Sequence, residues 1–207
     1  MNNLKLIVIT RPQFFEGETA LVNSMFGQGL MRLHLRKPQA TEEELAEWIG
    51  QIDEPFRQSL VLHDHHKLSR TMHLGGIHLN SRNPEVPEWV SEAKRERSFT
   101  VSRSCHSISE IRQHRDSCDY LFLSPIYDSI SKEGYGAAFS REELEEARSC
   151  GLLSDNVYAL GGVSLDKLPE LLTYGFYGAA ILGDLWNFAY DKQLLLSRLK
   201  NILYYVN

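Results

Sequence analysis

The sequence predicts an α/β protein, a single (β/α)8 TIM barrel formed by residues 1–207 as one domain. Eight short apolar runs have the composition of strands, helical segments separate most of them, and no linker divides the chain. Strands that alternate with helices pair in parallel through crossovers, and eight such units close a barrel. An open doubly wound sheet is the second interpretation, but no GxGxxG turn follows the first strand.

The predicted strands are runs rich in apolar and β-branched residues. Arg11-Pro12 ends the first run, and Ser124-Pro125 ends the sixth, because proline has no N–H for a central ladder. The eight strands are predicted at residues 4–10, 31–36, 59–63, 75–79, 99–102, 119–123, 156–160 and 177–182.

The helix boundaries follow from capping residues and glycines. Thr41 and Ser107 each stand three residues before a glutamate, which is the spacing of a capping box, and Ser140 precedes an acidic first turn. Gly151 and Gly175 close two of the later helices. Helices are predicted at residues 16–26, 64–68, 91–97 and 165–174, from residues 41, 107 and 140 onward, and after residue 183 to about residue 203.

The composition is that of an ordinary soluble globular protein, with 207 residues, 43% hydrophobic, 24% charged and a net charge of -5. No basic stripe suggests nucleic acid, and no apolar run is long enough to cross a membrane. The three cysteines have no CxxC spacing, so we expect free thiols in the cytoplasm rather than disulfides or a zinc site. A few local cations must then hold any anionic ligand, and a homo-oligomer remains open.

Polar residues gather at or just past the C-terminal ends of the predicted strands. In a (β/α)8 barrel these ends meet at one mouth, where the active sites of this fold lie. The residues at these positions are His34, Arg36, His63, Asp64, His78, Asn80, Ser104, His106, Ser124, Ser129, Ser131, Lys132, Gly161, Gly162 and Gly183. Their convergence predicts a ligand site at the mouth.

Two groups among these residues favour anions. Ser129, Ser131 and Lys132 offer hydroxyls and an ammonium in a glycine-rich loop, although an ordinary polar loop is an equal interpretation. The glycines after the last two strands lie where barrels commonly bind phosphate, whereas a lone Gly-Gly pair is more simply a turn.

The charged residues and histidines at the mouth each allow two interpretations. Arg36 either binds an anionic group or pairs with a carboxylate. Asp64 is either a magnesium ligand or the N-cap of the short helix that follows it. His106 is either an acid/base or a structural histidine. The eight histidines include no HExxH pair, so zinc is not expected.

Taken in order, the motifs resemble those of the thiamine phosphate synthases and the related thiazole tautomerases, over nearly the whole chain. The family carries a QLRxK-like second strand, an ND pair, GVHLG, SxH, DYxxxGPIxxTxTK, IGGI and a G-V-A-V run. Here these stand as HLRKP at 34–38, HD at 63–64, GIHLN at 76–80, SCH at 104–106, the stretch 119–132, LGGV at 160–163 and GAAILG at 178–183. Order and spacing both hold.

The resemblance implies a barrel enzyme of thiamine biosynthesis, a transferase with Mg2+ as its cofactor and small phosphorylated molecules as substrates. It would join hydroxymethylpyrimidine diphosphate to thiazole phosphate, or to its carboxylate, giving thiamine phosphate and pyrophosphate. The implied catalytic residues are Arg36, Ser104, His106 and Lys132. The implied substrate-binding residues are His34, Arg36, His63, Ser129, Ser131, Lys132, Gly161, Gly162, Leu182 and Gly183, and the implied magnesium ligands are Asp64 and Asn83.

Several positions depart from the family pattern. His34 replaces a glutamine, His63 replaces an asparagine, and Asn83 stands where a second magnesium aspartate is expected. Pro38 stands at the lysine of the second strand, with Lys37 displaced by one residue.

Three hypotheses for the function remain open. Tautomerases of the family also tend to carry a histidine at the position of His34, and they use the SxH histidine as their acid/base. We favour the synthase because the predicted diphosphate loop is retained. The alternatives are a tautomerase acting on the thiazole carboxylate phosphate and a non-catalytic regulatory barrel that binds a phosphate ligand.

Overall fold

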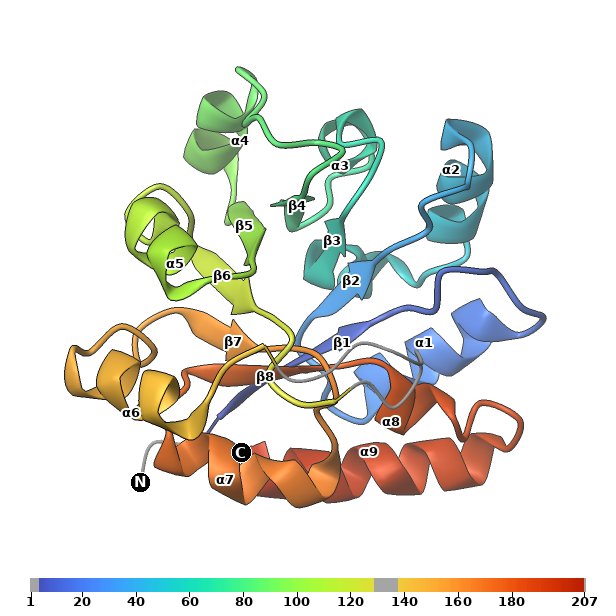
Figure 1. Ribbon diagram of the computed structural model, residues 1–207. Coiled ribbons are helices and arrows are strands. Elements are labelled where there is room, and N and C mark those ends of the chain that lie inside the picture. The colour runs from blue at the N-terminus through green and yellow to red at the C-terminus, as the bar shows by residue number, and fades with distance from the viewer. Residues whose placement is uncertain (1–3, 129–137, 207) are drawn as a thin grey trace.

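The computed structural model describes residues 4–128 and 138–206 and contains a closed barrel of eight parallel strands (Figure 1). The strands follow chain order: β1 (Lys5–Ile9), β2 (Leu33–Leu35), β3 (Leu60–Leu62), β4 (Gly76–Leu79), β5 (Thr100–Cys105), β6 (Tyr120–Leu123), β7 (Val157–Ala159) and β8 (Gly178–Ile181). Strand β8 pairs with β1, with Lys5 opposite Gly178, and this pairing closes the barrel. The predicted barrel is confirmed, and the open doubly wound sheet is wrong.

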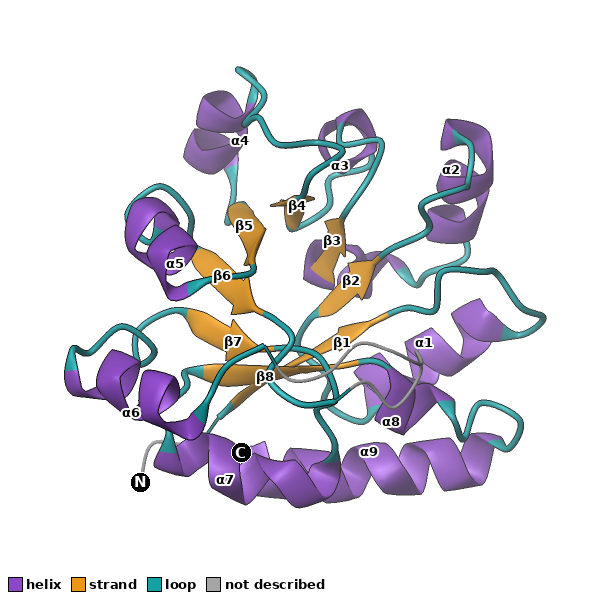
Figure 2. Ribbon diagram, in the orientation of Figure 1, coloured by secondary structure: helices purple, strands orange, loops and turns teal. Residues whose placement is uncertain are grey.

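The helices lie outside the ring of strands (Figure 2). They are α1 (Glu18–Gly27), α2 (Glu42–Gly50), the 3-10 turn η1 (Glu54–Ser59), α3 (Lys67–Thr71), α4 (Val90–Glu96), α5 (Ile108–His114), α6 (Arg141–Ser149), the 3-10 turn η2 (Leu165–Lys167), α7 (Leu168–Thr173), α8 (Gly183–Trp186) and α9 (Lys192–Val206). The capping box predicted at Thr41 begins α2. At the start of α5, Ser107 accepts from the Glu110 N–H as predicted, but the Glu110 carboxylate accepts from the His106 N–H, so the box is not closed. A capping box that was not predicted begins α6 at Ser140. No helix among the described residues is long and apolar enough to span a membrane.

Three predicted boundaries are corrected by the structure. Asp64 does not cap α3, which begins after His66, because its carboxylate is paired with Arg82. Strand β5 continues to Cys105 instead of ending at residue 102. The chain after β8 forms the two helices α8 and α9 rather than one.

Side chains fill the barrel on both faces of the strands. A large apolar cluster lies between strands and helices, and a smaller one lies inside the barrel. The inner cluster consists of Ile7, Ile9, Tyr120, Phe122, Tyr158 and Ala180. On the side of β2, β3 and β4, however, the interior is filled by the buried imidazole rings of His34, His63 and His78. Polar rings therefore occupy part of a space that is usually aliphatic in this fold.

A buried ion pair fixes the chain after β1 and β2 to the helical layer. Lys37 Nζ lies 2.7 Å from both carboxylate oxygens of Glu18, and Trp48 Nε1 donates to the same carboxylate at 3.0 Å. Lys37 also donates to the backbone oxygen of Gln13 at 2.8 Å. Burial raises the pKa of Glu18 and lowers that of Lys37, so each ion depends on its partner. Lys37 thus has a structural contact and does not line the cavity described below.

Candidate active site

A cavity of about 1040 Å³ opens where the C-terminal ends of the strands meet. Its walls include Ile9 at the end of β1, Arg36 after β2, His63 after β3, Ser104 near the end of β5 and Leu182 after β8. Residues from both halves of the chain therefore meet at one mouth, as the strand-end pattern predicted.

The structure brings about half of the predicted site residues to this cavity. Those that line it are Arg36, His63, Ser104, His106, Leu182 and Gly183. His34 lies beneath the floor, and Asp64 and Asn83 line a neighbouring groove that shares Arg82 with the cavity. Ser129, Ser131 and Lys132 lie outside the described residues.

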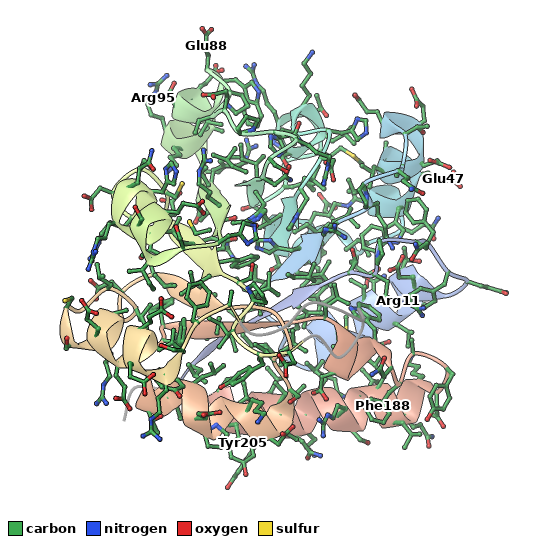
Figure 3. All side chains as sticks on the ribbon, viewed as in Figure 1. Arg11, Glu47, Glu88, Arg95, Phe188 and Tyr205 are labelled. Carbon is green, nitrogen blue, oxygen red and sulfur yellow. The ribbon has the colours of Figure 1, made fainter. Side chains whose placement is uncertain are left out.

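Four arginines line the cavity, which makes it strongly cationic. They are Arg11, labelled in Figure 3, and Arg36, Arg82 and Arg103. Among the described residues that line it, Glu110 is the one carboxylate. Burial and the nearby Arg82 lower the pKa of Arg36, and Asp64 only partly offsets them. Such a cavity is electrostatically suited to a ligand with several negative charges.

Arg103 shows a further unused donor at the wall. One of its terminal nitrogens donates to the backbone oxygen of Pro84, which holds the guanidinium in place. Its Nε is buried and has no hydrogen-bond partner within the described parts of the chain. A buried guanidinium N–H without an acceptor is costly, and Nε is too buried to be reached from the cavity in this arrangement.

Asp64 and Asn83 lie side by side, but their polar atoms are already paired. The Arg82 guanidinium donates to both oxygens of Asp64 at 2.9–3.0 Å. The Asn83 amide nitrogen donates to Asp64 at 3.1 Å and to the backbone oxygen of His63 at 3.2 Å, which fixes the orientation of the amide. A cation and N–H groups thus face the one carboxylate, whereas magnesium needs oxygen ligands. These two residues, as arranged, do not fit a resident magnesium ion.

Three buried histidines form the layer beneath the cavity. One nitrogen of each of His34, His63 and His78 lies within 4.8 Å of the others, which is the kind of set a transition metal uses. The rings of His63 and His78, however, stack with centroids 4.1 Å apart and planes at 24°. Lone pairs of stacked rings run side by side instead of converging on one ion. Burial lowers the pKa of all three, that of His78 to about 3, so they are neutral at pH 7.

His106 is exposed at the cavity wall and differs from the interior histidines. Its Nδ1 donates to the backbone oxygen of Ser124 at 3.0 Å. In the neutral ring this bond leaves Nε2 as the nitrogen with a free lone pair. His106 therefore has the geometry of an acid/base group at the cavity.

The glycines after β7 are required by packing, whatever they bind. Gly161 and Gly162 have φ values of +88° and +64°. A Cβ on Gly161 would lie 2.7 Å from the Cα of Pro125, and one on Gly162 would collide with the backbone oxygen of Asp128. The turn after β7 thus lies against the segment after β6. Neither glycine lines the cavity directly.

Three of the four cavity arginines, Arg11, Arg82 and Arg103, were not among the predicted site residues. Arg11 directly follows β1, so the strand-end rule would have included it. Arg103 directly follows residue 102, the predicted end of β5, so the strand-end rule would have included it as well; the structure extends β5 to Cys105. Arg82 lies in the loop after β4, where no sequence pattern distinguishes it from a surface arginine.

Comparison with known proteins adds a consistent set of relatives. A model of the family described as thiamine monophosphate synthase matches residues 6–185. The crystal structure of thiamine phosphate pyrophosphorylase from Bacteroides thetaiotaomicron is similar, with a TM-score of 0.84 and 35% identity, and covers 97% of this chain and 96% of that one. The thiamine-phosphate synthase of Flavobacterium johnsoniae is 22% identical over 207 residues, 97% of this chain and 96% of the relative. That of Pediococcus pentosaceus is 28% identical over 141 residues, 67% of this chain and 63% of the relative.

Proposed function

Because the chain belongs to the thiamine monophosphate synthase family, we propose that it is a thiamine phosphate synthase, a transferase of thiamine biosynthesis. The family predicted from the motifs is thereby confirmed. The proposed reaction joins hydroxymethylpyrimidine diphosphate to thiazole phosphate and releases pyrophosphate; with the thiazole carboxylate phosphate as substrate, CO2 is released as well. A cytoplasmic location and a homo-oligomer remain predictions from the sequence.

The observation that carries the proposal is the convergence of four arginines on one cavity at the barrel mouth. In the proposed reaction the bond between the pyrimidine methylene and the diphosphate oxygen breaks, and the electron pair leaves with the oxygen. The thiazole nitrogen then attacks the remaining cation. Guanidinium groups neutralise phosphate oxygens through paired hydrogen bonds, and they do so more strongly in a cavity with little water.

Individual roles follow from position. Arg36 and Arg103 would hold the leaving diphosphate, and Ser104, which also lines the cavity, would lie beside the reacting ring. The backbone N–H groups at Leu182 and Gly183, which line the cavity at the start of α8, would receive the thiazole phosphate.

The remaining predicted groups stay predictions. Gly161 and Gly162 would complete the thiazole phosphate site. Ser129, Ser131 and Lys132 would contribute further donors to the diphosphate. Magnesium is expected from the family resemblance, but Asp64 is paired with Arg82. We therefore assign no step of the reaction to the metal.

The second candidate function is a thiazole tautomerase, and His106 is the observation that favours it. A tautomerase moves a proton and does not expel pyrophosphate, so it needs an acid/base and one phosphate site. His106 lines the same cavity, and its free Nε2 would serve that purpose. The arginines would then exceed what the reaction requires.

The two candidates are separated by assaying both reactions in three proteins. Wild type, His106→Asn and Asp64→Asn would each be tested for thiamine phosphate formation and for proton exchange on the thiazole carboxylate phosphate. We expect the wild type to form thiamine phosphate. The synthase proposal fails if no thiamine phosphate forms while proton exchange occurs and is abolished by His106→Asn alone.

A further inference from the structure

Two of the four cavity arginines lie next to buried residues that do not line the cavity. Arg11 follows Thr10 after β1, and Arg36 precedes Lys37 after β2. Arg11 and Arg36 line the cavity, whereas Thr10 and Lys37 are buried outside it. Successive side chains of an extended segment point to opposite sides, so each arginine has a neighbour that faces the surrounding packing.

Thr10 holds the backbone of Arg36 by two hydrogen bonds. The Arg36 N–H donates to Thr10 Oγ1 at 2.9 Å, and Thr10 Oγ1 donates to the backbone oxygen of Arg36 at 3.3 Å. The Thr10 N–H also donates to the backbone oxygen of His34 at 3.0 Å, next to the pairing of Ile9 with His34. One hydroxyl thus fixes the residue that carries the Arg36 guanidinium to the end of β1.

Lys37 connects the same two segments further along the chain. Its ammonium has three donors, which bind the two carboxylate oxygens of Glu18 at 2.7 Å and the backbone oxygen of Gln13 at 2.8 Å. Trp48 Nε1 donates to the same carboxylate at 3.0 Å. The ammonium therefore has no donor left for a ligand, and it ties the chain after β2 to the chain after β1.

Stability alone does not account for this buried pair. Desolvating two ions costs about as much as their attraction contributes, so apolar side chains of similar volume would fill the space equally well. An apolar side chain cannot, however, hold the Gln13 carbonyl, and Arg11, Pro12 and Gln13 form part of the cavity wall. What the pair supplies is therefore the position of that wall relative to Arg36.

We propose that Thr10, Glu18 and Lys37 are positioning residues, which fix the cationic walls after β1 and β2 at the separation that binds a diphosphate. None of the three touches the ligand. This inference rests on the proposed function, because it takes the diphosphate as the ligand of these walls. A displacement of about 1 Å can reduce a rate about a hundredfold, so loss of these contacts should weaken diphosphate binding even where the fold is retained.

The double variant Lys37→Met with Glu18→Leu separates position from stability. It removes one positive and one negative charge, so the net charge of the chain does not change. Calorimetry should show that inorganic pyrophosphate binds at least about tenfold more weakly than to wild type, although most of the stability is retained. Amide hydrogens of residues 11 and 13–15 should also exchange faster than in wild type. A folded double variant that binds pyrophosphate within about twofold of wild type overturns the proposal.

The contact of Thr10 with Arg36 is tested without disturbing the ion pair. Thr10→Val keeps the volume of the side chain but removes the hydroxyl, and it should weaken pyrophosphate binding about fivefold or more. Thr10→Ser keeps the hydroxyl and should bind within about twofold of wild type. Equal affinities of Thr10→Val and Thr10→Ser overturn the proposal, even if the double variant does not fold.

The matched control is a second double variant that leaves the net charge unchanged, Arg70→Met with Glu92→Leu. It removes an exposed ion pair of 2.6 Å between α3 and α4, and neither residue lines the cavity. Its affinity for pyrophosphate should lie within about twofold of wild type. A loss equal to that of Lys37→Met with Glu18→Leu overturns the proposal, because the effect would not be specific to the contacts of Lys37.

The outcomes distinguish this inference from the proposed function. A wild type that binds pyrophosphate but forms no thiamine phosphate contradicts the synthase, and the comparison of affinities still decides the positioning role. A wild type that forms thiamine phosphate, with a double variant that binds pyrophosphate equally well, contradicts the positioning role alone. A wild type that does not bind pyrophosphate contradicts both.

Discussion

Replacing Arg36 with glutamine tests whether the cationic cavity holds a diphosphate. Arg36 is half-buried at the cavity wall, and burial together with Arg82 lowers its pKa. A charge-assisted hydrogen bond is worth about 1.5–3 kcal/mol, so losing one such contact should lower kcat/KM roughly 10- to 150-fold. The lowered pKa means that the fold disfavours the charged guanidinium. The same substitution should therefore leave the melting temperature unchanged or raise it.

The assay is formation of thiamine phosphate, with calorimetric binding of pyrophosphate as a second measurement. Both should weaken in Arg36→Gln. Arg95→Gln, on the exposed surface of α4, is the matched control and should change neither activity nor Tm. An Arg36→Gln protein with kcat/KM within twofold of wild type would refute the assignment. A large drop in Tm with weak loss of activity would instead mark Arg36 as a structural cation.

Three further predictions concern charge. Lys132→Ala should lower kcat/KM for thiamine phosphate formation by roughly a hundredfold or more, since a transition-state charge contact is lost; an unchanged rate in a folded variant contradicts this. Calorimetry should show little magnesium binding to the free protein and clear binding with pyrophosphate. Arg82→Ala should strengthen magnesium binding to the free protein, whereas Arg70→Ala on the surface should not. Tight magnesium binding by the free wild type contradicts the pairing of Asp64 with Arg82. Urea denaturation should show that Lys37→Met lowers the free energy of unfolding by about 3–5 kcal/mol. The double variant, Lys37→Met with Glu18→Leu, should regain most of that free energy. Equal losses in the single and the double variant argue against a coupled buried pair.

The strands could be predicted because a parallel barrel places both faces of each strand against other side chains. Each strand then appears in the sequence as a short apolar run bounded by a turn residue. Strand β5 is the exception, since Ser102, Arg103 and Ser104 interrupt the run with polar residues that face the interior or the cavity. The predicted strand therefore ends at residue 102, three residues before the observed end at Cys105.

The role of Asp64 could not be predicted because it depends on a contact across the fold. Local spacing makes Asp64 a reasonable N-cap. The guanidinium of Arg82, from the loop after β4, instead takes both carboxylate oxygens. Asp64 and Arg82 are 18 residues apart in the sequence. No local sequence pattern predicts which of the four cavity arginines pairs with the Asp64 carboxylate.

Two neighbouring cations after β2, Arg36 and Lys37, point in opposite directions and make different contacts. Successive side chains point to opposite sides, so Arg36 reaches the cavity while Lys37 reaches Glu18 in the helical layer. Composition alone assigns the two cations the same chemistry. Only the direction of the side chain makes one a candidate for binding an anion and the other part of a buried ion pair.

The histidines divide in the same way, and the division bears on the choice between synthase and tautomerase. His34, His63 and His78 have pKa values lowered by burial, so they carry no charge at neutral pH and cannot exchange protons as acids there. The replacement of glutamine by His34, which resembles the tautomerases, therefore adds no acid/base to the cavity. Of the other histidines that line the cavity, His106 and His114 are left to move a proton on a substrate, against four arginines that favour expulsion of a diphosphate. The balance of charges in the cavity thus supports the synthase more strongly than the number of histidines supports the tautomerase.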